Sequence, residues 1–211
     1  MAIKRRWTLR AYHFASALVL GLFVALHLAN HIAGLAGHAQ HVAVMHAVRP
    51  LYRNAVVEPL LLALFASQIV SGLAMVIRGW QSRHGGVAWL QAASGLYLAV
   101  FITIHALAVL SGRAALGLDT DFRFAAAGFH VPGWPWYFWP YYSLAVLALF
   151  AHAGCAIYWK MSGRDRRSAL LVLRAIVATG AVLGLLIVAA LAGKLYPVDI
   201  PARYKATYTA V

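Results

Sequence analysis

Acidic residues and cysteine are scarce in this chain. Of its 211 residues, five are Asp or Glu, 18 are Lys or Arg, and one is Cys. A single cysteine excludes an internal disulfide framework, and it excludes cofactor attachment through a Cys-x-x-Cys-His motif. The chain also lacks a linker rich in Ser, Gly or Pro and any internal repeat with a period of about 20–50 residues. We therefore expect residues 1–211 to form one domain.

Hydrophobic residues make up most of what is present. They account for 63% of the chain, charged residues account for 11%, and the mean hydropathy is +0.75. This balance is typical of a polytopic membrane protein and unlike that of a soluble domain. Five apolar runs are long enough to cross a bilayer, at about 12–36, 57–78, 88–111, 139–160 and 169–193. The sequence therefore predicts an all-α membrane protein with five transmembrane helices.

The basic residues gather at the ends of the apolar runs. Membrane topology and anionic lipid therefore explain the net charge of +13 better than binding to nucleic acid does. With a cytoplasmic N-terminus, eleven Lys and Arg residues fall on the cytoplasmic side and seven on the other side. The positive-inside rule then favours an N-terminus inside and a C-terminus outside. We expect the protein to lie in a bacterial inner (cytoplasmic) membrane. The tail from Tyr196 is expected to lie on the outer surface without regular structure.

Three histidines, His27, His105 and His152, lie within the apolar runs. Ionisable side chains at membrane depth are costly and usually face a bundle interior or a cofactor. The rise of a helix places His27 roughly 22 Å and His105 roughly 25 Å from the cytoplasmic edge. The same measure places His152 roughly 12 Å from that edge. The first two are therefore expected at one level, and His152 in another layer.

Two histidines at one level on facing helices can hold the iron of a porphyrin. Gly21 and Gly95 lie lower on the same two runs as His27 and His105, where they would leave room for a flat macrocycle. The alternative is that each histidine bonds a neighbouring carbonyl or lines a polar cavity. The matched levels favour heme ligation by this pair.

His152 lacks a histidine partner at its own level on the second run. That run offers Gln68 and Ser71, which are poor ligands for heme iron. Cys155 could share a helix face with His152, although a small core cysteine is the commoner role. A second heme beside His152 therefore stays an open question.

Other histidines offer alternatives near the outer end of the first run. His31 could replace His27 as a ligand, or could bond a propionate or a quinone. A copper or zinc site built from His31, His38 and His41 is another arrangement, since imidazole suits both metals, but no nearby carboxylate supports it. Interfacial positions are expected for His13, His84 and His130.

Three charged residues on the outer side are candidates for quinone or propionate chemistry. Glu58 begins the second run, where its carboxylate could favour the helix dipole or accept a proton during quinol oxidation. Arg49 and Arg53 could pair with heme propionates from the same side, or could bind lipid phosphate.

Three stretches carry a resemblance to a known family: 17–27 ending at His27, 89–95 leading to His105, and 139–142 leading to His152. Because the three stretches occur in the family's order, the chain resembles the single-chain, five-helix cytochrome b anchor of succinate dehydrogenases and fumarate reductases. The resemblance runs from about Tyr12 to the tail. The resemblance implies that the first four helices surround two stacked b hemes. It assigns His27 and His105 to the outer heme and His152 to the inner one, whose second-span ligand is missing here. It also places Phe150 where some members carry a glutamate for proton transfer.

The function implied by the resemblance is electron transfer between an iron–sulfur partner and membrane quinone through heme b. The anchor would dock a flavoprotein and an iron–sulfur subunit on its basic cytoplasmic face, and the dicarboxylate chemistry would belong to those partners. Two rival hypotheses are a heme-free structural or quinone-binding anchor and a membrane oxidase or metal transporter that uses the outer histidines.

Overall fold

Five long helices dominate the computed structural model, which describes residues 2–208. They are α1 (Ala2–Ala33), α3 (Val57–Arg78), α4 (Gly86–Ala114), α6 (Pro135–Met161) and α7 (Arg166–Leu191). Each is long and apolar enough to cross a membrane, with candidate spans Leu9–Ala36, Val57–Arg78, Gly86–Ala114, Pro135–Met161 and Arg166–Leu191. The predicted all-α fold with five long apolar helices is confirmed, and the spans indicate a membrane location.

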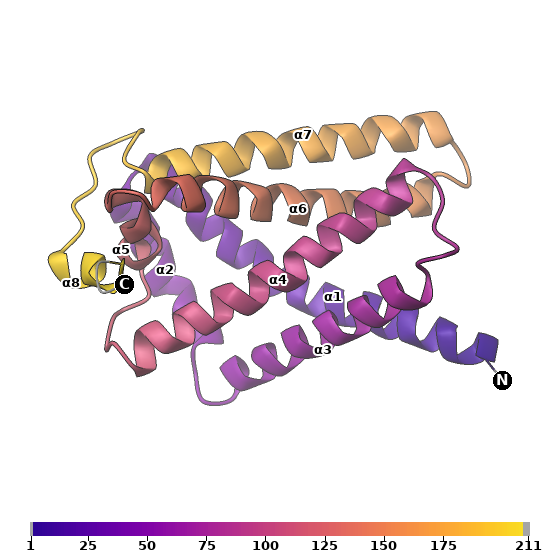
Figure 1. Cartoon of the computed structure of the whole chain (residues 1–211), viewed down its shortest axis with the longest axis horizontal. Coiled ribbons are helices and arrows are strands. Elements are labelled where there is room, and N and C mark those ends of the chain that lie inside the picture. Colours follow the sequence, from indigo (N-terminus) through magenta and orange to yellow (C-terminus); the bar gives the residue numbers. More distant parts are fainter. Residues whose placement is uncertain (1, 209–211) are drawn as a thin grey trace.

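Short helices fill the segments between and after the long ones. These are α2 (His38–Tyr52), α5 (Phe122–Ala126), α8 (Ala202–Lys205) and 3-10 turns at Gly34–Ala36, Ala127–His130 and Ala206–Tyr208. Figure 1 shows α2, α5 and α8 gathered at one end of the molecule, opposite the N-terminus; we call this the α2 end. The connections from α3 to α4 and from α6 to α7 lie at the other end.

The starts of three helices follow from local sequence. Asp165 caps α7 by accepting hydrogen bonds from the backbone N–H groups of Arg167 and Ser168, at 2.9 and 3.2 Å. Asp121 caps α5 in the same way. Pro135 occupies the first turn of α6, where its missing N–H costs nothing.

The long helices pack in a defined order. α1 lies against α3, α4 lies against α6, and α7 runs along α6 over its length (Figure 1). Gly180 and Gly184 on α7 form a Gly-x-x-x-Gly pair at this last contact. A Cβ atom at Gly184 would lie 2.9 Å from the backbone oxygen of Ser143, and one at Gly180 would overlap Phe150. Small residues therefore set the close approach of α6 and α7, as they do between many membrane helices.

The tightest apolar core lies at the α2 end. Phe122, Val188 and Tyr204 are almost completely buried there, and they join α5, the end of α7 and the tail. The hydroxyl of Tyr196 donates to the backbone oxygen of Gly34 at the end of the first span. The expectation of a tail without regular structure holds for residues 196–201, but it is wrong for residues 202–208, which form α8 and a 3-10 turn. The aromatic residues of the tail gain free energy from burial in this core.

Apolar side chains also cover the outside of the helix bundle. Leu22, Val70 and Ile77 each expose about two thirds or more of their surface, at 69%, 67% and 73%. An exposed apolar belt of this kind fits contact with lipid.

Candidate functional site

His27 on α1 and His105 on α4 lie next to each other, with one ring edge toward the other ring's face. Their ring centroids are 6.1 Å apart and their planes are inclined by 69°. Phe23 stacks on His27 at 5.9 Å, and Phe101 stacks on His105 at 5.3 Å, each from one helical turn earlier. This stacking fixes both rings in the bundle interior, and the expected matching of their levels agrees with the structure.

The separation of the two rings suits a shared metal ion. A histidine nitrogen binds a metal at about 2 Å, so two imidazoles on opposite sides of one ion place their centroids about 6 Å apart. A Cβ atom at Gly21, one and a half turns below His27, would meet nothing within 4 Å. Gly21 is exposed and lies about 120° around the helix from His27, so it does not make room beside this pair of rings. The separation of the rings alone fits two residues that could hold one metal ion.

His152 on α6 is oriented by α4. Its Nδ1 atom lies 3.1 Å from the backbone oxygen of Gln91 and 3.4 Å from the hydroxyl of Ser94. Because a carbonyl only accepts, Nδ1 carries the proton and Nε2 is the nitrogen with a free lone pair. A Cβ atom at Gly95 would lie 2.9 Å from Cε1 of His152, so this glycine makes room for His152 and not for the outer pair.

The polar residues on α3 have a structural partner in His13. Gln68 Nε2 lies 3.1 Å from Nε2 of His13, and the hydroxyl of Ser71 lies 2.8 Å from its Nδ1. The hydroxyl of Ser16 donates to Oε1 of Gln68 at 2.6 Å. These bonds tie α1 to α3 through polar side chains that satisfy one another. Sequence reasoning missed this role of His13, although the three-residue spacings on the two runs pointed to facing polar stripes.

The outer histidines form a chain of rings that does not make a metal site of its own. His31 lies 4.9 Å from His27 and 5.4 Å from His41, measured between ring centroids. Within residues 2–208, no group of three or more His, Cys, Asp or Glu side chains is arranged to hold a metal ion. The copper or zinc site suggested for His31, His38 and His41 is therefore not formed in the part of the chain that the structure describes.

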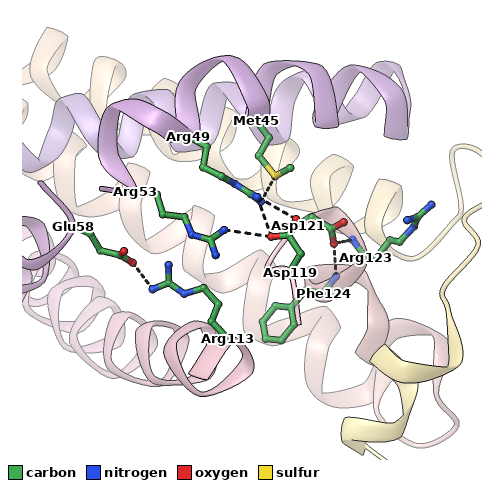
Figure 2. A network of polar contacts seen from close by, with 9 residues as sticks. All are labelled: Met45, Arg49, Arg53, Glu58, Arg113, Asp119, Asp121, Arg123 and Phe124. Carbon is green, nitrogen blue, oxygen red and sulfur yellow. Dashed lines mark hydrogen bonds and ion pairs between the residues drawn. The ribbon is translucent and has the colours of Figure 1, made fainter. Parts of the chain in front are cut away.

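Charged side chains form a network at the α2 end (Figure 2). Arg49 and Arg53 share the carboxylate of Asp119, with N–O distances of 2.9 and 3.3 Å. Glu58 pairs with Arg113, which joins the start of α3 to the end of α4. Two guanidinium groups on one carboxylate leave an excess positive charge that suits an anionic group. The carboxylate of Glu58 is engaged by Arg113 and is not free in this arrangement.

The stability that Asp119 contributes through these ion pairs depends on pH. Partial burial raises the pKa of its carboxyl, but hydrogen bonds and charge from Arg49 and Arg53 outweigh that effect and hold the pKa below its ordinary value of 3.8. The carboxyl of Asp119 therefore binds a proton less readily in the native state than in the unfolded state. The resulting stabilisation is complete above the ordinary pKa and is lost as the pH falls through the native value.

Replacing Asp119 with Asn is expected to lower the free energy of unfolding by about 1 kcal/mol at neutral pH, since its side chain is 43% exposed and solvent screens the pairs. Thermal melting of both proteins in detergent measures this. The difference should vanish in strongly acidic buffer, where the wild-type carboxyl is also neutral. Asp199→Asn, at an exposed position of the tail, is the matched control. An equal difference at every pH would contradict the assignment to this carboxylate.

No protein-family model matches the chain, and searches of curated proteins and of solved structures found no match either.

Proposed function

We propose that the chain is the membrane-anchor cytochrome b of a succinate:quinone or fumarate oxidoreductase. The observation that carries the proposal is the pair His27 and His105, whose ring centroids lie 6.1 Å apart between two apolar helices. When bound, heme b would supply one-electron transfer at that position. The partners would be an iron–sulfur protein and a flavoprotein, and the substrate on the membrane side a quinone.

The residues of the chain have distinct roles in this proposal. His27 and His105 hold the heme, and Phe23 and Phe101 fix the orientation of their rings. The excess positive charge of Arg49 and Arg53 at Asp119 attracts the propionates. We assign one heme, because α3 presents Gln68 and Ser71 to His13 where a second ligand for His152 would be needed.

The membrane arrangement follows from charge. A cytoplasmic N-terminus would place the basic connection from α6 to α7 on the same side as the iron–sulfur partner, in a bacterial cytoplasmic membrane. The α2 end, with its histidines and arginines, would then face outward.

Purification of the full chain in detergent, followed by a dithionite-reduced spectrum and a pyridine hemochrome assay, tests the proposal. One heme b per chain is the expected result. Absence of heme from protein produced with ample heme supply would overturn it. The partners are tested separately, by asking whether a flavoprotein and an iron–sulfur protein co-purify from the native membrane.

The second candidate function is a heme-free anchor. The hydrogen bonds that Gln68 and Ser71 make to His13 favour it, because they show that polar residues on α3 need no cofactor to be satisfied. The hemochrome assay separates the two candidates.

A further inference from the structure

Three arginines border a hollow at the start of α7. The hollow has a volume of about 510 Å³ and is lined by Arg166, Arg167, Leu170, Leu171 and Arg174. Spacings of three and four residues place side chains on one side of a helix, so the guanidinium groups come from successive turns and border the same space. The chemistry of the hollow is therefore that of a basic site with an apolar part.

The ion pairs of the structure leave these guanidinium groups without a carboxylate. Among residues 2–208, the ion pairs are those of Glu58 and Asp119 at the α2 end. Asp165 is the only acidic residue between positions 122 and 198. Its carboxylate accepts from the backbone N–H groups of Arg167 and Ser168 and caps the helix. An excess of positive charge therefore stays at the hollow, where it suits an anionic group.

The hollow lies on a helix at the edge of the molecule. α6 runs along one side of α7 (Figure 1), and Gly180 lies at this contact. Leu171 lies about two and a half turns before Gly180, on the opposite side of α7. Val182 and Leu185 share the side of Leu171, and the three expose 59%, 54% and 56% of their surface, in that order. The basic hollow therefore continues into an apolar stripe that faces away from α6.

Arg174 has the most to gain from an anionic partner. It lies eight residues after the first residue of the candidate span Arg166–Leu191, roughly 12 Å along the helix axis. A charged side chain at such a depth is costly unless it reaches the interface or meets an opposite charge. Its long side chain borders the same hollow as Arg166 and Arg167, so one anion held there would serve all three.

We propose that the start of α7 binds an anionic phospholipid. Its phosphate lies between the three arginines, because a guanidinium group matches phosphate oxygens with two parallel hydrogen bonds. Its acyl chain lies along Leu171 and Val182. A soluble phosphate would leave the apolar stripe uncovered, whereas a lipid covers both parts of the site. In the proposed orientation this end faces the cytoplasm, and the cytoplasmic leaflet is rich in anionic lipid.

Equilibrium binding of a fluorescent phosphatidylglycerol to the purified full chain in neutral detergent tests the inference. Unlabelled phosphatidylglycerol is expected to displace the probe. Phosphatidylcholine, whose headgroup has no net charge, and glycerol 3-phosphate, which has no acyl chain, are expected to leave it bound at the same concentration.

Single substitutions locate the site. Arg167→Gln and Arg174→Gln are each expected to weaken binding about fivefold, since one basic residue near an anionic surface contributes about 1 kcal/mol. Leu171→Gln keeps every charge and is expected to weaken binding about fourfold through the lost acyl contact. Arg164→Gln is the matched control, because it removes the same charge from an exposed position of the same end that does not line the hollow.

Each contrary result has a definite meaning. An equal loss in Arg164→Gln and Arg174→Gln would show diffuse surface charge and overturn the site. Displacement by glycerol 3-phosphate as strong as that by the lipid would show a site for soluble phosphate, and displacement by a polyglutamate peptide would show a surface for an acidic protein; either would overturn the lipid assignment. The measurement does not involve heme, so failure of the cytochrome proposal would leave its result unchanged.

Discussion

Replacing either His27 or His105 with alanine is expected to remove the same heme, lowering the hemochrome content of the purified protein at least tenfold. The ring centroids lie 6.1 Å apart, and each variant would remove one of the two residues that we propose would hold the heme. The loss should be equal in the two variants because the ligands act on one iron. Heme per chain and the α-band of the reduced spectrum measure it.

Two controls make the result specific. His46→Ala and His84→Ala change exposed histidines and should keep full heme content. His152→Ala should also keep the heme held by the outer pair, since its ring is held by Gln91 and Ser94 of α4 in another layer. Loss of all heme in His152→Ala, with retention in His27→Ala, would show that the assigned pair is wrong.

Replacing Gly180 with alanine is expected to lower the free energy of unfolding by about 3 kcal/mol, the upper part of the range for overpacking. The added methyl group would overlap Cβ of Phe150 and lie 2.7 Å from its Cγ. Cβ is fixed to the backbone and cannot turn away, so α6 and α7 would have to separate. Thermal melting in detergent, followed by the helical circular dichroism signal, measures the effect.

Gly21→Ala is the matched control for this experiment. Both glycines lie inside long helices, but a Cβ atom at Gly21 would meet nothing within 4 Å. Its replacement should leave stability unchanged or raise it by up to about 1 kcal/mol, the difference in helix propensity. Equal melting temperatures for the Gly180 and Gly21 variants would contradict the packing account.

The long helices and the matched histidines could be predicted because both depend on distance along the chain. Apolar run length locates a span, and helical rise converts the positions of His27 and His105 into depth. Apolar run length did not predict α2, because its histidines and Arg49 interrupt the apolar sequence. The Gly-x-x-x-Gly pair of α7 was readable from the sequence, and it is the signal that would have indicated the α6–α7 contact.

The polar contacts between distant segments could not be predicted in the same way. The pairing of Arg49 and Arg53 with Asp119 joins α2 to the loop before α5. No local pattern fixes how such a loop folds back. The partner of His13 depended on the rotation of α1 and α3 about their axes, and depth alone does not give that rotation.

The contact between Tyr196 and Gly34 implies an order in which parts of the fold are completed during synthesis. The two residues are 162 positions apart, and the residues that complete the core at the α2 end come from the final part of the chain. During synthesis the first four spans are therefore complete while this end is still uncovered.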